Sequence, residues 1–128
     1  MKLAPFVSVD GTPFASRPED VIRARGAPAR AGRNGVGLDE LDYGEVVFRF
    51  QDSGRLEEIT TRAPVLSIGT LAVPFRSLRA FVIESDPAAF ERAGFVVSPK
   101  FGLAFDPETS EAWVTALARH CIGAWRAL

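Results

Sequence analysis

The chain of 128 residues contains one cysteine, Cys121, and one histidine, His120. A single cysteine excludes an internal disulfide, and one cysteine with one histidine cannot make a conventional zinc site. Consecutive side chains diverge by about 100° on a helix and about 180° on a strand. We therefore expect no nucleophile–base dyad from these two neighbours, and we predict no catalytic residues, no metal site and no cofactor.

Long apolar runs are also missing. The opening residues, MKLAPFVSVDG, lack the run of about 7–15 apolar residues that a signal peptide needs. No segment approaches the roughly 18 apolar residues of a membrane span. These absences predict a cytoplasmic protein that does not enter a membrane.

The chain carries almost no excess charge and very little lysine. The net charge is −1, so there is no general attraction to nucleic acid or to an anionic membrane. Lys2 and Lys100 are the only lysines among 15 basic residues. The arginine excess is typical of a GC-rich coding bias, or of a set of rigid bidentate anion donors.

Hydrophobic residues make up 47% of the chain and charged residues 24%, which is ordinary for a globular protein and predicts one compact domain over 1–128. Residues 6–14 alternate briefly and turn at Asp10-Gly11, which predicts a short strand or an extended segment. Ser16 and Glu19 have capping-box spacing, and Gly26 is a plausible helix stop, so we predict a helix over 17–25. A loop rich in glycine, alanine and arginine follows at 27–37.

The stretch EVVFRFQDSGRLEEITTR predicts a β-hairpin. Residues 45–50 alternate with Val46, Phe48 and Phe50 on one face, and 55–62 form the returning strand. Residues 51–54, QDSG, supply the aspartate and glycine that a tight turn favours.

After Pro64 the pattern begins again. PFASRPEDVI (13–22) aligns with PFRSLRAFVI (74–83) at an offset of 61, and five of the ten positions are identical. FRFQDSGRLEEIT (48–60) aligns with LAFDPETSEAWVT (103–115) at an offset of 55, which pairs Phe50 with Phe105. We therefore predict an internal repeat, with unit one at 6–63 and unit two at 64–128.

Two segments of the second unit need separate interpretation. Residues 77–85 suit a buried strand by composition, but the repeat favours a helix. Residues 86–94, DPAAFERAG, begin with a capping Asp86 and end at Gly94, so a second helix is predicted there. The fold class that results is α+β, with two tandem helix-plus-β-meander units that share an antiparallel sheet and place their helices on one face.

Short motifs carry a resemblance to known families. Gly26-Ala27-Pro28 after a helix, followed by Tyr43-Gly44 before a hairpin, resembles the small α+β unit of outer-membrane assembly lipoproteins, and a tandem of such units resembles the β-lactamase inhibitory proteins. SPKFGLAFDPE (98–108) followed by WVTALA (113–118) is similar to small bacterial immunity proteins, which bind and neutralise toxins. The lipidated N-terminal cysteine and the disulfides of the first two families are missing here.

The resemblance implies a non-enzymatic protein-binding module that occludes a toxin or an enzyme. Asp39, Glu40 and Asp42, with Tyr43 beside them, are either a solvated loop or a patch for a basic partner. The alternative function is small-molecule or nucleotide binding by the arginine- and glycine-rich loop at 23–37. That loop lacks the Gly-Lys-Ser/Thr ending of a phosphate loop.

Alternation along the strands also predicts the contents of the second sheet face. If Phe48, Phe50 and Phe105 face the helices, their neighbours point to the other side. That side would carry charged and small residues and one large aromatic side chain: Val47, Arg49, Glu58, Thr60, Arg62, Ala104, Trp113, Thr115 and Leu117. Trp113 is either a binding hot spot with Arg49, Glu58 and Arg62 around it, or is covered by the C-terminal segment containing Trp125.

Overall fold

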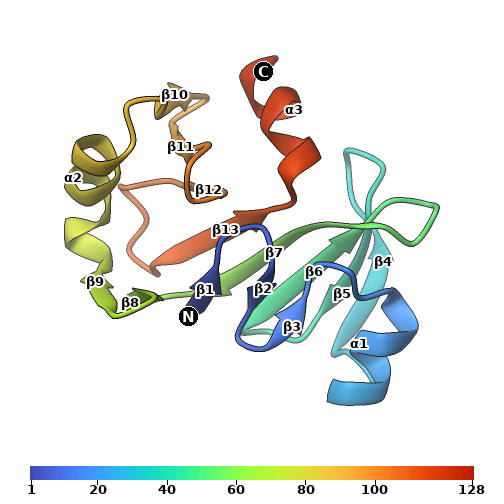
Figure 1. Cartoon of the computed structure of the whole chain (residues 1–128). Coiled ribbons are helices and arrows are strands. Elements are labelled where there is room, and N and C mark those ends of the chain that lie inside the picture. The colour runs from blue at the N-terminus through green and yellow to red at the C-terminus, as the bar shows by residue number, and fades with distance from the viewer.

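The computed structural model describes all 128 residues. It confirms an α+β protein, with three α-helices, one short 3-10 helix and two β-sheets of five and eight strands (Figure 1). No helix is both long enough and apolar enough to cross a membrane.

The larger sheet is antiparallel throughout, in the order β10–β11–β12–β13–β7–β6–β5–β4. The chain builds it as two four-strand meanders, and β13 pairs with β7 where the meanders meet. The strands are β4 (Arg30–Arg33), β5 (Asp39–Asp42), β6 (Val46–Phe50), β7 (Leu56–Arg62), β10 (Phe90–Arg92), β11 (Phe95–Ser98), β12 (Leu103–Phe105) and β13 (Trp113–Leu117).

The smaller sheet has the order β3–β2–β1–β8–β9. β1 runs antiparallel to β2 and parallel to β8, so it joins two short hairpins. The sequence indicated only the part over 6–14, which contains β2 and β3. The rest of the sheet was not predicted, because strands of two to four residues are too short to show a clear alternation. Its strands are β1 (Lys2–Ala4), β2 (Ser8–Val9), β3 (Thr12–Pro13), β8 (Val65–Ile68) and β9 (Leu71–Pro74).

Helix α1 (Pro18–Arg25) confirms the predicted helix, although its capping pair lies one residue further along the chain. The N-cap is Arg17, whose backbone N–H donates to the Asp20 carboxylate at 2.9 Å, instead of the predicted Ser16–Glu19 pair. The helix ends at Gly26, whose φ of 81° is costly for any residue with a Cβ. The predicted loop over 27–37 is wrong in part, because Arg30–Arg33 pairs with β5 as the edge strand of the large sheet.

Helix α2 (Phe75–Ser85) confirms the helical interpretation of 77–85. The second helix predicted over 86–94 is wrong, because those residues form β10 and the turn into β11. Asp86 ends α2 instead of starting a new helix, and Ala93 and Gly94 both have positive φ, as a tight hairpin turn requires.

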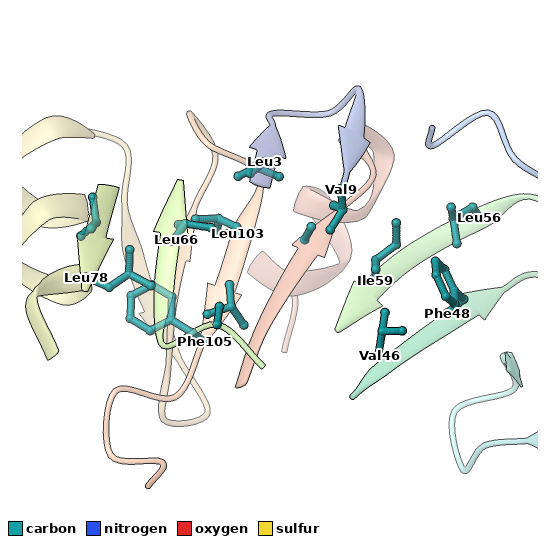
Figure 2. Packing of buried hydrophobic residues seen from close by; sticks show 14 of the residues in the cluster. Leu3, Val9, Val46, Phe48, Leu56, Ile59, Leu66, Leu78, Leu103 and Phe105 are labelled. Atoms are coloured by element: carbon teal, nitrogen blue, oxygen red, sulfur yellow. The ribbon is translucent and has the colours of Figure 1, made fainter. Parts of the chain in front are cut away.

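One hydrophobic core lies between the two sheets (Figure 2). Leu3, Val9 and Leu66 from the small sheet pack with Phe48 and Phe105 from the large one. Val21 of α1, together with Leu78 and Val82 of α2, joins the same cluster. The predicted inward positions of the central strands are therefore confirmed, and nearly all of them are 1% exposed or less.

The opposite face of the large sheet is partly covered by the C-terminal segment, which consists of a 3-10 turn, η1 (Arg119–Cys121), and helix α3 (Ile122–Arg126). Figure 1 shows α3 standing over the middle of the sheet. This segment closes a second, smaller cluster made of Val97, Ala104, Leu117, Ala118 and Cys121. The expectation that helices lie on one face only is thus incomplete, because α3 packs on the other side.

Candidate functional site

The second face of the large sheet carries the side chains that alternation predicts. Across the β7–β13 pair, Glu58 lies opposite Leu117, Thr60 opposite Thr115 and Arg62 opposite Trp113. Leu117 is fully buried beneath the C-terminal segment, whereas the other five side chains are only partly covered or, for Arg62, exposed. The uncovered part of this face is called the open face below.

A pocket of about 400 Å³ opens on this face beside α3. Trp113 and Trp125 both line it, so one indole comes from the sheet and the other from the C-terminal helix. We call this pocket the two-tryptophan groove. Its other lining residues are Arg49, Glu58, Thr60, Phe95, Asp106, Thr109 and Thr115.

Trp113 is half-buried and belongs to neither hydrophobic cluster. Its indole N–H donates to the Glu111 carboxylate at 2.8 Å. The Arg62 guanidinium lies 5.8 Å from its ring centroid, within the range of a cation–π contact. These polar partners hold the ring in place at the edge of the groove while leaving it accessible.

Arg49 does not offer a free guanidinium. Its Nε donates to Glu40 at 2.7 Å and its Nη1 donates to Thr60 at 2.6 Å. The Thr60 hydroxyl lies 2.8 Å from the Thr115 hydroxyl. This chain of contacts neutralises Arg49 within the protein and fixes the floor of the groove.

Glu58 carries the least satisfied charge in the groove. The Trp125 indole N–H donates to its carboxylate at 3.3 Å, and no other side chain is hydrogen-bonded to it. Burial raises the pKa of Glu58, although the nearby Arg49 acts against that rise. The arrangement is a partly desolvated carboxylate in contact with the Trp125 indole, in a groove that Trp113 also lines, and this setting favours an incoming cation.

The other predicted partner-binding residues lie away from the groove. Asp42 pairs with Arg30 at 2.9 Å, and Asp39 pairs with Arg33 at 3.5 Å, so both are engaged on the outer strands. The Tyr43 hydroxyl donates to the backbone carbonyl of Gly26, and its ring packs edge-on against Phe48. Tyr43 therefore fastens α1 to the sheet.

The arginines of the loop at 23–37 are similarly engaged. Arg23 pairs with Asp20, Arg30 with Asp42, and Arg33 with both Asp39 and Asp52. Arg25 lies over the rings of Tyr43 and Phe48. Each of these four guanidiniums already has a partner in the chain, which leaves little positive potential for a phosphate.

His120 and Cys121 converge on one carboxylate instead of diverging, although no hydrogen bond joins the two to each other, so the expected absence of a nucleophile–base dyad stays a prediction. Both side chains reach Glu57, a carboxylate 4% exposed on β7. His120 Nε2 contacts Glu57 Oε2, and the Cys121 thiol donates to the same oxygen at 3.3 Å. The irregular 3-10 turn of η1 allows this, because a regular helix or strand would separate the two side chains.

Burial and the adjacent Glu57 carboxylate raise the pKa of the Cys121 thiol far above its ordinary value. The thiolate is the nucleophilic form of cysteine, so this environment makes Cys121 an inert thiol toward electrophiles. The geometry therefore offers no support for cysteine nucleophilic catalysis in the absence of a cation.

Sequence reasoning missed Phe95, Asp106, Thr109 and Trp125 as groove residues. Phe95 directly follows the helix predicted over 86–94, and its ring centroid lies 5.3 Å from that of Trp125. Trp125 was considered only as a cover for Trp113. The apolar spacing of the last ten residues was the one available signal, but it does not say which sheet face they cover.

No protein-family model, curated protein or solved structure matches this chain.

Proposed function

We propose that this protein is a non-enzymatic binding module, an inhibitor or immunity-type protein that occludes a toxin or enzyme by docking it on the open face. The observation that carries the proposal is Glu58, a partly desolvated carboxylate with one side-chain hydrogen-bond donor, Trp125, in a groove that Trp113 also lines. A rigid sheet with an aromatic recess has the composition of an interface hot spot.

The chemistry of the groove favours a basic side chain from the partner. Glu58 and Asp106 are carboxylates in its lining, whereas Arg49 is neutralised by Glu40. A lysine or arginine entering here would donate a charge-assisted hydrogen bond to Glu58 and gain cation–π contact with the indoles.

The tandem repeat remains part of the proposal, and several contacts support it. Each meander follows a helix and a short hairpin, and Pro13 and Pro74 end the corresponding hairpins. The aligned residues Val21 and Val82 are both buried in the same core. Thr60 and Thr115, aligned at an offset of 55, face each other directly across β7 and β13, as a two-fold axis between equivalent strands requires.

The ladders do not support the predicted equivalence of Phe50 and Phe105. Val46 pairs with Thr61, and Leu103 pairs with Ala116, so the first hairpin is two residues longer between matching positions. When Thr60 is matched to Thr115, the ladder therefore matches Phe105 with Phe48. A β-bulge between Arg49 and Phe50 takes up part of the difference.

Doubling the unit has a functional consequence under this proposal. One meander alone would present a narrow face, whereas the second meander adds Trp113 and the covering C-terminal segment, which together complete the groove. A rigid backbone loses little conformational entropy on binding, so most of the contact energy is retained as affinity.

The first test uses the indole N–H resonances of the two tryptophans in NMR spectra. N-acetyl-arginine amide should shift the Trp113 and Trp125 signals saturably, whereas N-acetyl-glutamine amide should leave them unchanged. Glu58→Gln should abolish the response. Equal shifts from the charged and neutral amides would reject a cation-selective groove.

The second test identifies and measures the partner. A photo-crosslinking residue at Thr109, on the groove, should capture one protein in cells, whereas the same residue at Arg76, on α2, should not. Trp113→Ala should then weaken binding of the purified partner by about 30-fold, or about 2 kcal/mol, the hot-spot scale. Arg23→Ala, on the exposed side of α1, is the matched control and should bind normally.

Two results would overturn the proposal. One is unchanged partner affinity in Trp113→Ala. The other is a loss of folding stability of about 3 kcal/mol or more in that variant, which would return the ring to a core role. Nucleotides should give no saturable rise in melting temperature, because the loop arginines are already paired.

A further inference from the structure

The cluster of Glu57, His120 and Cys121 plays no part in the proposed docking. Glu57 belongs to β7, and the other two residues belong to the η1 turn more than sixty positions later in the chain. One ligand-type atom from each lies within 4.8 Å of the other two. A carboxylate oxygen, an imidazole nitrogen and a thiol sulfur thus meet at one point.

We propose that Glu57, His120 and Cys121 bind a zinc-class divalent cation with three protein ligands. Zn²⁺ accepts this mixture of oxygen, nitrogen and sulfur, at bond lengths of roughly 2.0–2.3 Å. Ligands at such lengths in a tetrahedron are separated by about 3–4 Å, so side-chain adjustments of about an ångström complete the geometry. Magnesium and calcium are disfavoured because they select oxygen ligands.

The surroundings provide a route to a fourth ligand. Glu57 and Cys121 line a pocket of about 350 Å³ whose other walls are mostly apolar. The walls come from the loop before β5, from α3 and from the last residue: Val36, Leu38, Ala124, Trp125 and Leu128, with Glu58 beside them. A water or a small anion could enter here, because three protein ligands leave one tetrahedral position open.

The charges around the site also suit a cation. The Glu57 carboxylate and the Cys121 thiolate formed on coordination would together balance a divalent ion, with His120 binding as neutral imidazole. The thiol proton is released to solvent in that step. Arg55 lies 3.7 Å from Glu57 on the far carboxylate oxygen and leaves the oxygen shared by His120 and Cys121 for the ion.

Occupancy would tie the C-terminal segment to the sheet. Trp125 lies four residues after Cys121 and lines both the pocket beside the cluster and the two-tryptophan groove. A cation held by β7 and η1 would therefore fix one wall of the groove. This inference rests only on residues of this chain and does not depend on the proposed partner.

Cobalt(II) is the probe, because its spectrum reports the ligand set directly. Metal-free protein titrated with Co²⁺ should bind one equivalent, with a thiolate-to-cobalt charge-transfer band and the intense visible bands of a tetrahedral site. Zn²⁺ should displace the cobalt and raise the melting temperature by preferential binding to the folded state.

The variants separate ligation from folding. Cys121→Ser should remove the charge-transfer band, and His120→Ala and Glu57→Gln should each weaken cobalt binding by at least tenfold. Glu45→Gln, an exposed carboxylate before β6, is the matched control and should bind as the native protein does. Circular dichroism of each variant shows whether the fold is retained.

Absence of a thiolate band in the native protein, or unchanged affinity in folded His120→Ala, would overturn the proposal. Either result would leave the cluster as a hydrogen-bonded contact between β7 and η1. Arginine-amide shifts at the groove could still be observed in that event, so failure of the metal site and failure of the docking proposal are distinguishable.

Discussion

The two meanders of the large sheet present very different outer surfaces. Across the first, Arg30 lies opposite Asp42, and Asp42 lies opposite Val47 on the next strand. Across the second, the corresponding run is Phe90 opposite Val97, and Val97 opposite Ala104. The first run is a solvated surface with an ion pair, whereas Val97 and Ala104 are fully buried beneath the C-terminal segment.

The difference shows how the outer face of one sheet can be part of a hydrophobic core in one half and a solvated surface in the other. Where α3 and η1 cover the second meander, the strands carry apolar residues on both sides and become part of a core. Where nothing covers the first meander, its outer face remains polar, as for an antiparallel sheet with one solvated side. The two-tryptophan groove lies at the border, so one wall belongs to the sheet and the other to the cover.

The largest change in folding stability should come from placing a charged residue on the covered outer face and an apolar residue on the uncovered one. Val97→Asp puts an unpaired charge into the covered cluster and should cost about 3–5 kcal/mol of folding stability. Asp42→Val on the uncovered meander loses an exposed ion pair and a turn hydrogen bond and should cost about 1 kcal/mol or less. Urea unfolding of both variants measures the contrast, and equal costs would contradict the picture of one covered and one open half.

The next effect concerns how each helix ends before its meander. Helix α1 ends at Gly26, whereas α2 ends at Asp86, a carboxylate 3% exposed. Asp86 accepts hydrogen bonds from the Ser98 hydroxyl and from the backbone N–H groups of Lys100 and Ala88. Asp86→Ala leaves these donors unpaired and should cost about 2–3 kcal/mol at neutral pH.

The pH dependence of that loss has a defined sign. Burial acts to raise the pKa of Asp86, but its hydrogen bonds from Ser98, Lys100 and Ala88 outweigh it, and the folded-state pKa is lowered. The stabilisation is therefore present above the unfolded-state pKa and is lost as pH falls through the folded-state pKa. The gap between native protein and Asp86→Ala should narrow in acid, whereas Glu84→Ala on exposed α2 surface should show no such trend.

A smaller change in folding stability is expected at Glu58, in the two-tryptophan groove between the two meanders. The folded-state pKa of Glu58 is raised, so the native state holds its proton longer than the unfolded state does. Stability should therefore fall as pH rises from the unfolded-state pKa through the raised folded-state pKa. Glu58→Gln removes this loss and should be more stable than the native protein at pH 7, by about 1 kcal/mol or less. Thermal melts from pH 4 to 8 would show it, and a destabilised Glu58→Gln would count against a strained carboxylate.

The smallest change in folding stability concerns the contact between β7 and β13, where the two meanders meet. Thr60 and Thr115 are hydrogen-bonded across β7 and β13 at 2.8 Å, and Thr60 also accepts from Arg49. Thr115→Val should cost about 0.5–1 kcal/mol, whereas Thr60→Val should cost more because Arg49 also loses an acceptor. A double-mutant cycle would give the coupling, and fully additive losses would mean that the hydroxyl contact contributes nothing.

Much of the large sheet could be predicted from the sequence. The strict alternation of Val46, Phe48 and Phe50 indicated both the strand and its buried face, and it was confirmed because a two-residue period survives any tertiary context. Helix α2 was favoured only because the segment aligned with α1. The helix expected at 86–94 was wrong. The Asp86 carboxylate accepts hydrogen bonds from Ala88 and also from Ser98 and Lys100, which are too distant in the chain for a local pattern to indicate.

For the candidate site, the sequence indicated Trp113, Arg49 and Glu58 by alternation alone, and all three line one groove. The sequence did not show that Arg49 pairs with Glu40, because their contact depends on the register between β5 and β6. The sequence also did not indicate that Glu57 contacts His120 and Cys121, because this contact depends on the position of the η1 turn over β7.

The amino-acid sequence by itself determined which residues share a strand face, where the two main helices lie, and the absence of disulfides. These are local properties, set by side-chain periodicity and composition within a few residues. The tertiary structure alone decided that α3 covers the second meander, that Trp125 faces Trp113 across a groove, and that Glu57, His120 and Cys121 converge. Those outcomes depend on contacts between separate segments, which lie more than sixty residues apart in the case of Glu57 with His120 and Cys121, and only the packed sheet defines their geometry.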